Sequence, residues 1–347
     1  MVGQPSSMVD SARGKRGMIE SAVVARRLKK IYEPSPRWMK FLVRTNLTQD
    51  VVALDEVDFE VGPGELLAVV GPNGAGKSTA FRILVGLTSP TSGSAKVMGL
   101  DSTTESKRVR RLTGWMPAED RSLLLRLSCR ENLRFHGRLH GMQQRHVEER
   151  IDTILDQVGL SVFADATPFA LSAGMRARLQ LARALLHEPR VLILDEPTGA
   201  VDPVAAHALL ELIIEIVEKN RLAALISSHR LEEIEALHSH VILLDRGAIR
   251  YDGDLDDLRR KYDRARVELE FTDHTSASQA ELMLKRGQKV ESSAIDGDSL
   301  VVTLSPGVRL SDVFAGLGGE REQLVHMRDS RTPLRDVLAA LYRDASP

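Results

Sequence analysis

The sequence contains a single cysteine, Cys129, among its 347 residues. A lone thiol excludes an intrachain disulfide and a cysteine-rich zinc site, and it fits a reducing cytoplasm. No apolar run approaches the roughly 20 residues that a membrane-spanning helix needs, and the longest candidates, such as 191–194, are short strand cores. The formal net charge of −1 lacks the basic surplus of a protein that works mainly on nucleic acid. We therefore expect no nucleic-acid partner.

The N-terminal stretch 1–17 is polar and lacks an apolar segment. It carries Arg13, Lys15 and Arg16 with nothing hydrophobic behind them, so it does not have the form of a secretory signal. We expect a disordered leader over 1–17, with Met18 as an alternative start. The rest of the chain is an ordinary globular mixture, with 43% hydrophobic and 27% charged residues, and its length suggests two domains.

Strand-like and helical patterns alternate along 18–256, which we take as the first domain. Strands are expected at 22–25, 52–61, 66–70, 191–194, 223–227, 241–244 and 248–251, and helices at 77–85 and 204–219. A mostly helical subdomain is expected over about 118–187, with helices at 130–139 and 146–158. Strands that alternate with helices predict an α/β fold around a central, largely parallel sheet.

The composition changes in the highly charged run 252–264, which is typical of a linker helix, with 257–264 joining the two domains. Beyond it, strands are expected at 266–271, 289–293, 300–304 and 323–327, and helices at 277–285, 310–317 and 333–341. The order β-α-β-β-α-β predicts a small ferredoxin-like α+β domain over 265–347. We expect this second domain to have an accessory or regulatory role.

A glycine-rich loop separates the expected strand 66–70 from the expected helix 77–85. It comprises Gly71, Pro72, Asn73, Gly74, Ala75, Gly76, Lys77 and Ser78, followed by Thr79, and it matches the P-loop pattern. Glycines let backbone N–H groups turn inward around phosphate oxygens, and the helix N-terminus adds a favourable dipole. We expect Lys77 to reach the β- and γ-phosphates of a nucleotide and the Ser78 hydroxyl to bind Mg²⁺. A chance glycine-rich turn is disfavoured because strand, loop and helix are all in place.

Two carboxylates, Asp195 and Glu196, directly follow the buried strand 191–194. Ligands of open α/β sheets bind at the carboxyl ends of the strands, so Asp195 is placed to hold Mg²⁺, directly or through water. Glu196 is the candidate general base for an attacking water, with a local cap or salt bridge as the alternative. His229 follows the expected strand 223–227 and would lie at the same edge, near the γ-phosphate. Its position alone leaves a structural role equally open.

The stretch Leu171-Ser172-Ala173-Gly174-Met175 is an element that other P-loop ATPases lack. With it, the region 22–253 resembles the nucleotide-binding subunit of ABC transporters, because five motifs occur in the order of that family. The resemblance implies a RecA-like core, an antiparallel β subdomain and a helical signature subdomain. It also implies that Asp202 is the D-loop aspartate and that Tyr32 stacks on adenine, with Trp38 as the alternative stacking residue.

The same resemblance implies a composite ATP site. Ser172 and Gly174 of one subunit would close on ATP that is held by the loop of a second copy or of a paralogue. Hydrolysis of Mg-ATP would drive a permease on a separate chain, which places the protein at the cytoplasmic face of the cell membrane. The stretch 171–175 corresponds to the signature of that family, and it is similar to the signatures of ABC-2-type exporters. An ABC importer ATPase is one rival. A soluble ABC mechanoenzyme acting on ribosomes or DNA is another, disfavoured because one cassette and no long coiled coil are present.

Two departures from the family pattern stand out. The glutamine of the Q-loop is replaced by Ala118, with Glu119 next, and we expect Glu119 to take over the contact with Mg²⁺ as a hard oxygen ligand. A solvated loop carboxylate is the alternative. The second departure is an insertion over 33–46 that contains Trp38 and Phe41 beside several cations. It is either a short helix packed on its own domain or a helix that faces a membrane or a partner.

Overall fold

The computed structural model describes residues 21–34, 49–118, 122–237, 239–262, 266–287, 289–305, 308 and 310–330. The chain divides into two compact units, Met1–Leu255 and Asp256–Pro347. The expectations for the leader 1–17, for Trp38 and the insertion from residue 35 onward, for Glu119 and for the helix 333–341 lie outside the described residues. Within these ranges, no helix is long and apolar enough to cross a bilayer.

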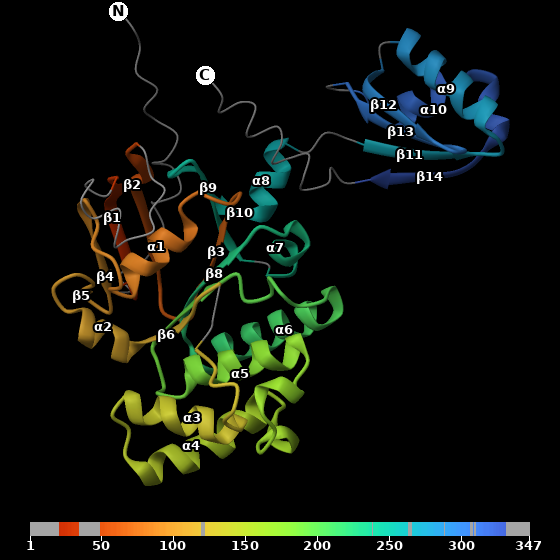
Figure 1. Ribbon diagram of the computed structural model, residues 1–347. Helices are drawn as coiled ribbons and strands as arrows, with labels where there is room; N and C mark the ends of the chain where they lie inside the picture. Colours follow the sequence, from red (N-terminus) through yellow and green to blue (C-terminus); the bar gives the residue numbers. More distant parts are fainter. Residues whose placement is uncertain are drawn as a thin grey trace, which may run out of the picture. The chain divides into compact units, whose positions relative to one another are not determined.

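The first unit is built on two sheets (Figure 1). The antiparallel one has the order β2-β1-β4-β5, and the larger one has the order β10-β9-β3-β8-β7-β6. The first comprises β1 (Val23–Tyr32), β2 (Val51–Val61), β4 (Ser92–Val97) and β5 (Leu100–Asp101). The second comprises β3 (Leu66–Val70), β6 (Thr113–Met116), β7 (Val191–Asp195), β8 (Ala223–Ser228), β9 (His240–Asp245) and β10 (Ala248–Asp254). Its strands are parallel except for the antiparallel edge β10, which confirms the α/β class.

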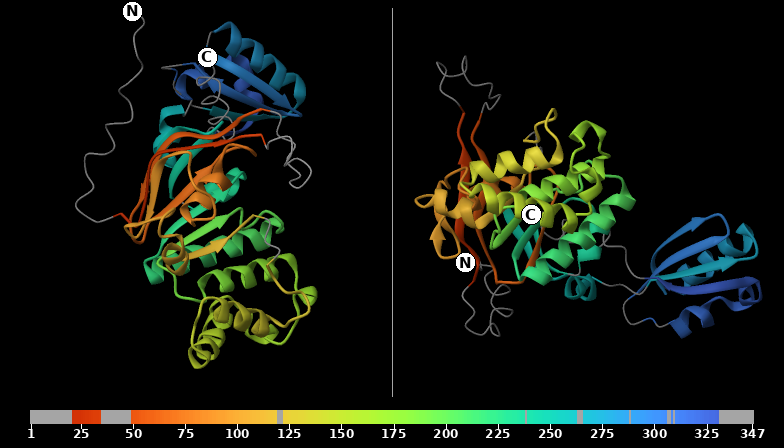
Figure 2. Two further views of the ribbon diagram at one scale, coloured as in Figure 1. Left: turned by 60° about the vertical axis from the view of Figure 1, so that its left-hand side comes forward. Right: turned by 90° about the horizontal axis from the view of Figure 1, so that it is seen from below.

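Two groups of helices complete this unit. The sheets are accompanied by α1 (Lys77–Leu84), α2 (Ser106–Leu112), α6 (Pro203–Asn220) and α7 (Leu231–Leu237), and a helical part contains α3 (Cys129–Leu139), α4 (Gln144–Gln157) and α5 (Ala173–Leu185). Figures 1 and 2 show α3 and α4 at the end of the unit away from β1 and β2. Ser128 starts α3 with a capping box to Glu131, which satisfies backbone donors at the exposed helix end.

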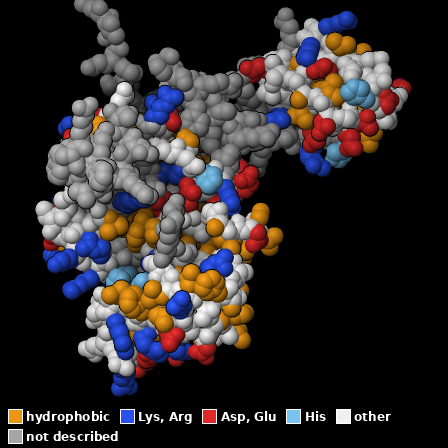
Figure 3. Space-filling model, viewed as in Figure 1, with side chains coloured by type: hydrophobic (Ala, Val, Ile, Leu, Met, Phe, Trp, Pro, Cys, Tyr) orange, Lys and Arg blue, Asp and Glu red, His pale blue; other side chains and the backbone are white. Residues whose placement is uncertain are grey.

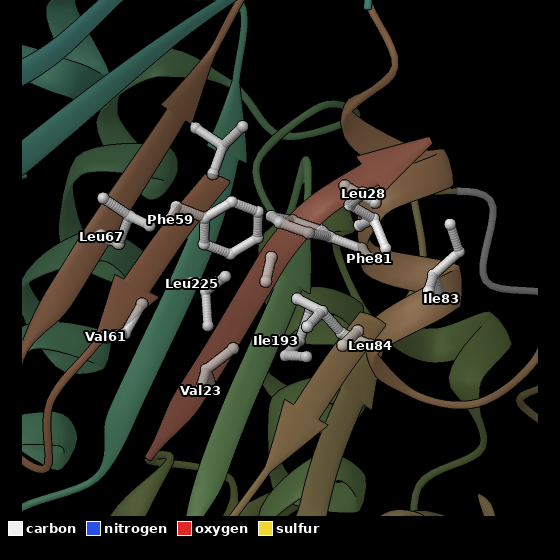
Figure 4. Close-up of a cluster of buried hydrophobic side chains, with 14 of the residues drawn as sticks. Val23, Leu28, Phe59, Val61, Leu67, Phe81, Ile83, Leu84, Ile193 and Leu225 are labelled. Atoms are coloured by element: carbon white, nitrogen blue, oxygen red, sulfur yellow. The ribbon is translucent and has the colours of Figure 1, made fainter. Parts of the chain in front are cut away.

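The main core lies between the two sheets and α1 (Figure 4). Phe81 of α1 and Leu28 of β1 are both fully buried, and Phe81 meets Trp115 of β6 edge to face at 6.4 Å between ring centroids. Burial of each such side chain contributes about 2 kcal/mol. This packing fixes α1 against both sheets, so the loop that leads into α1 has a rigid support.

The second unit contains a four-stranded antiparallel sheet with the order β12-β13-β11-β14. In chain order its elements are β11 (Arg266–Phe271), α9 (His274–Arg286), β12 (Val290–Asp296), β13 (Ser299–Leu304), α10 (Leu310–Gly316) and β14 (Leu324–Ser330), preceded by α8 (Leu255–Tyr262). Alternate residues of β11 and β13, such as Leu269 and Val302, pack with Ala280 of α9 in a separate core. The strand order and the β-α-β-β-α-β succession confirm the ferredoxin-like prediction.

The predicted elements differ from the structure in three places. The strand expected at 22–25 continues to Tyr32, because cations occupy the exposed positions of a strand whose inward residues include Leu28. The stretch 176–186, which the sequence predicts as a helix, belongs to a helix that already begins at Ala173, because Ser172 caps it. The elements β4, β5, β6, α2 and α7 were not predicted. They are short or polar, and two of them, β5 and β6, have no more than four residues.

Candidate active site

The glycine-rich loop passes close to neighbouring backbone, and two of its glycines are required for that reason. Gly76 is the N-cap of α1 with φ of 109°, and a Cβ atom there would lie 2.3 Å from the carbonyl oxygen of Ala53. A Cβ atom on Gly71 would lie 2.1 Å from the carbonyl oxygen of Leu244. Any side chain would therefore push the loop away from β2 and β9. The loop is held in the shape that a phosphate-binding cradle needs.

Lys77 is the first residue of α1, and only 5% of its side chain is exposed. Its Nζ donates hydrogen bonds to the carbonyl oxygens of Gly71 at 2.6 Å and Pro72 at 3.2 Å. The ammonium group thus lies inside the curve of the loop, where its positive charge would meet the phosphate oxygens of a nucleotide. It also lies 3.6 Å from Oε1 of Glu196.

Asp195 ends β7 at the carboxyl edge of the parallel sheet, opposite Ser227 of β8. Asp195 is almost completely buried, and its Oδ1 accepts a hydrogen bond of 2.6 Å from the Ser227 hydroxyl. The same hydroxyl oxygen accepts the backbone N–H of Glu196 at 2.9 Å. Ser227 was not predicted as a site residue. It fixes both carboxylate-bearing positions, so it is a positioning residue of the site.

Glu196 lies between Lys77 and His229. Its Oε1 faces Lys77, and its Oε2 lies 3.3 Å from Nδ1 of His229. Its backbone has φ of 49°, a left-handed conformation that costs a non-glycine residue about 1 kcal/mol. Glu196 is 22% exposed and His229 is 42% exposed. A partly open carboxylate held between an ammonium and an imidazole is well placed to accept a proton from a water molecule.

The residues present fit a magnesium ion carried by a nucleotide. No group of three or more His, Cys, Asp or Glu side chains within the described ranges could hold a metal ion by itself. Mg²⁺ usually keeps several waters and binds through one or two protein oxygens plus phosphate oxygens. Asp195 and the hydroxyl of Ser78, in the first turn of α1, are such oxygen donors. This donor set matches a metal that arrives with ATP better than a resident metal.

The signature residues and Asp202 have structural roles within their own chain. Ser172 accepts the backbone N–H of Met175 at 3.2 Å and caps α5, and Asp202 accepts that of Ala205 at 3.0 Å and caps α6. A Cβ atom on Gly174 would lie 3.0 Å from Cβ of Ala205, so this glycine allows α5 and α6 to pack closely. In the part of the chain that the structure describes, no hydrogen bond or ion pair joins Ser172 or Asp202 to the glycine-rich loop.

Arg230, next to His229, was missed by the sequence reasoning. Its guanidinium donates to the carbonyl oxygens of Gly199 and Val201, both at 3.4 Å, and lies 3.3 Å from Glu233. It therefore ties the turn that precedes Asp202 to the segment that carries His229. The only sequence signal was the position of Arg230 directly after a strand end that already held a candidate histidine.

Tyr32 is the last residue of β1 and is partly buried. The ammonium group of Lys30 lies 5.1 Å from the centre of its ring. This contact occupies one side of the aromatic ring. The other side is where an adenine would stack if Tyr32 has the role that the sequence analysis gave it.

The comparisons with known proteins agree on one family. The family model described as ABC transporter matches residues 54–199. The chain is 39% identical to an ABC transporter ATP-binding protein, YxlF, of Bacillus subtilis over 60% of its own length and 68% of that protein. The chain is an ATP-binding subunit of an ABC transporter. Members of this family are ATPases, so the Lys77–Glu196–His229 cluster belongs to an ATP-hydrolysing enzyme.

Other relatives extend this picture. The ABC subunit is 39% identical to the Nod factor export ATP-binding protein I of Cupriavidus metallidurans, over 57% of this chain and 65% of that protein. It spans about two thirds of the length of each of these two relatives. Among solved structures, an ATP-binding subunit of an ABC transporter matches with a TM-score of 0.57 and 29% identity, over 70% of this chain and 93% of the other. These matches confirm the ABC-type P-loop fold.

Proposed function

We propose that this ATPase binds Mg-ATP between two cassettes and drives export through a membrane permease that is a separate chain. The cluster of Lys77, Glu196 and His229 at the carboxyl edge of the sheet supports hydrolysis. Among the described residues, Ser172 forms no hydrogen bond with that cluster and only caps its own helix, which supports a site that a second copy or a paralogue completes. Each subunit would then contribute a phosphate-binding loop to one site and a signature to the other.

Each residue of the site would have its own role in ATP hydrolysis. Lys77 neutralises charge on the β- and γ-phosphates, and Glu196 orients the attacking water and takes its proton. His229, on the other oxygen of Glu196, holds that carboxylate in place and adds a donor near the γ-phosphate. Mg²⁺, bound by Ser78 and Asp195, would polarise the phosphate oxygens. Ser172 and Gly174 of the partner would close the site and exclude bulk water, leaving the attacking water at Glu196.

An exposed apolar surface supports a partner protein for the helical part. Figure 3 shows hydrophobic side chains gathered over this part of the first unit. Phe135 and Leu139 lie one turn apart on α3 and are 41% and 67% exposed, and Leu124 and Leu125 of the preceding loop are 38% and 45% exposed. Asn132 of α3 binds the carbonyl and N–H of Leu124, so loop and helix are fixed together. Apolar side chains exposed together on rigid elements are typical of a protein-binding surface.

The direction of transport rests on the relatives. Proteins whose names state Nod factor export and multidrug transport are 38% to 39% identical to this chain. These names support export over import. They also support a position at the cytoplasmic face of the membrane, where the subunit would be held by its permease. The cargo would be selected by the permease.

Affinity purification of the full chain from detergent-solubilised membranes tests the partner. We expect an integral membrane protein to co-purify in stoichiometric amount, and replacement of both Phe135 and Leu139 by serine to reduce its recovery. Replacement of Leu282 by serine provides the control, because this leucine of the second unit is 55% exposed. It should leave the recovery of the membrane protein unchanged. Co-purification with ribosomes or DNA in place of a membrane protein would contradict the proposal.

A further inference from the structure

Arg230 lies in the short connection between β8 and α7, directly after His229 of the ATP site. Its guanidinium is 3.3 Å from the carboxylate of Glu233 in the first turn of α7. The side chain of Glu233 is only 9% exposed. A buried carboxylate that loses its cation is strongly destabilising, so the pair holds the guanidinium in one place. Arg230 is therefore an anchored side chain and not a solvated surface arginine.

The same anchor fixes the end of β8. The hydroxyl of Ser228, the last residue of β8, donates a hydrogen bond of 2.6 Å to the other carboxylate oxygen of Glu233. This hydroxyl oxygen also accepts the backbone N–H of Arg230 at 3.0 Å. His229 lies between Ser228 and Arg230 in the chain, and its Nδ1 is 3.3 Å from Glu196. A displacement of His229 would therefore move the backbone that carries Arg230.

The guanidinium of Arg230 also binds the turn 199–201. Its two terminal nitrogens donate to the carbonyl oxygens of Gly199 and Val201, both at 3.4 Å. The backbone N–H of Gly199 in turn donates to the carbonyl oxygen of Glu196 at 3.0 Å. A guanidinium presents its donors in a rigid planar fork, which the single ammonium of a lysine cannot reproduce. Arg230 thus joins the connection between β8 and α7 to this turn at two points.

The turn 199–201 packs on the signature of its own chain. Val201 is 5% exposed, and a Cβ atom on Gly174 would lie 3.6 Å from its Cγ1. The same Cβ atom would lie 3.0 Å from Cβ of Ala205 in the first turn of α6, and Figure 1 shows α5 and α6 side by side. Closely packed interiors transmit displacements. A shift of the turn would therefore move the N-terminus of α5, where Ser172 lies.

We propose that Arg230 is a positioning residue that couples the two ATP sites of a dimer. The inference rests on the proposed composite site, in which the signature of one chain completes the site of the other. ATP bound to one chain would set the position of His229. Arg230 would transmit that position through Val201 to the signature of the same chain, which closes on the ATP held by the second copy. The partner's site would therefore depend on this arginine.

Two inactive chains, mixed together, isolate one site of the dimer. The base-free chain carries Glu196→Gln and keeps its signature. The signature-blocked chain carries Ser172→Asp, which can still cap α5 but places a negative charge against the phosphates. Each alone should hydrolyse ATP slowly. Their mixture should recover activity at the one site that combines Glu196 of the signature-blocked chain with the signature of the base-free chain. A mixture without recovery would contradict the composite site itself, and with it the proposed function.

Arg230→Met is then introduced into either chain of the mixture. In the base-free chain it should lower the recovered rate about fivefold, the scale of the hydrogen bonds lost. In the signature-blocked chain the effect should be smaller, because Ser227 still holds the backbone of Glu196 there. Arg230→Lys in the base-free chain should also lower the rate, although its ammonium keeps the buried ion pair and hence the fold. Arg111→Met, a change of an exposed arginine on α2, is the control and should leave the rate unchanged in either chain.

His229→Ala in the base-free chain separates coupling from simple support of the signature. The active site of the mixture does not contain this histidine, yet we expect the recovered rate to fall. Adding Arg230→Met to the same chain should lower the rate no further than Arg230→Met alone, because the two residues act through one path.

Three results would overturn the proposal. The first is that Arg230→Met has no effect in either chain. The second is a loss confined to the signature-blocked chain, which would make Arg230 a support of His229 in its own site. The third is that His229→Ala in the base-free chain has no effect, or that its loss multiplies fully with that of Arg230→Met, which would show that the two residues are not coupled.

Discussion

His187, two residues after the end of α5, makes the stability of the ATP-binding unit depend on pH. Its ring stacks on His140 with 3.9 Å between the centroids, and its Nε2–H donates to the carbonyl oxygen of Thr113 at 3.1 Å. Its Nδ1 is buried without a partner among the described residues. Burial, followed by the proximity of His140, lowers the pKa of His187 from 6.5 to about 4. The folded protein therefore keeps this imidazole neutral.

The sign and size of the effect follow from this pKa. The unfolded chain protonates His187 below pH 6.5, whereas the folded chain does so only near pH 4. Stability is thus complete above pH 6.5 and is lost as the pH falls toward 4. The linkage relation gives a loss of about 2 kcal/mol in the free energy of unfolding at pH 5 relative to pH 8. Burial also lowers the pKa of His140, which acts in the same direction.

Urea unfolding at pH 8 and pH 5, followed by tryptophan fluorescence, measures this loss. Both tryptophans, Trp38 and Trp115, belong to the first unit, so the signal reports on that unit alone. The variant His187→Gln keeps an N–H donor for Thr113 and removes the titrating group. We expect its free energy of unfolding to fall by about 2 kcal/mol less than that of the wild type between the two pH values. Equal losses in both proteins would refute the reasoning.

Three further outcomes are expected. Tyr32→Ala should weaken ATP binding about fivefold, the scale of one aromatic stacking contact, in an equilibrium titration; a loss for Trp38→Ala alone would move the adenine site to that residue. Ser227→Ala should cut ATPase activity at least about tenfold and raise the Mg²⁺ concentration needed for half-maximal rate, since Asp195 loses its hydrogen bond; an unchanged Mg²⁺ profile would remove Ser227 from the site. Truncation after Lys261 should leave a folded unit that binds ATP, and a soluble, folded truncation without nucleotide binding would contradict this independence.

The part of the site that lies at the ends of the parallel strands could be predicted from the sequence, because the position of a residue after a strand determines where it lies in the fold. A loop and a helix after a buried strand, and carboxylates at the end of another, must lie at the same edge of a parallel sheet, so Lys77 and Glu196 could be expected to approach one another. The structure places their side chains 3.6 Å apart. The two-domain fold followed from the alternation of apolar strands with helices, which is a strong signal in both units.

Other features depend on contacts that no local pattern contains. Ser227 read as an ordinary strand residue, yet its hydroxyl binds both Asp195 and the backbone of Glu196. Gly174 was expected only to meet ATP, whereas its missing side chain also allows α5 to approach Ala205 on α6. The continuation of β1 to Tyr32 was hidden by cations whose partners, such as Asp55 for Lys29, come from the adjacent strand. Each of these features depends on a contact between residues that are far apart in the sequence.

The rate of ATP hydrolysis by Glu196→Gln tests the central claim most directly. Glutamine keeps the shape and a carbonyl oxygen near Lys77 and His229 but cannot take a proton from water. We expect hydrolysis to fall by about 10²-fold or more while ATP binding persists, and a closed dimer to accumulate with ATP. Glu215→Gln, an exposed change on α6, should hydrolyse ATP at the wild-type rate. Hydrolysis by Glu196→Gln at a rate near that of Glu215→Gln would show that Glu196 is not the base.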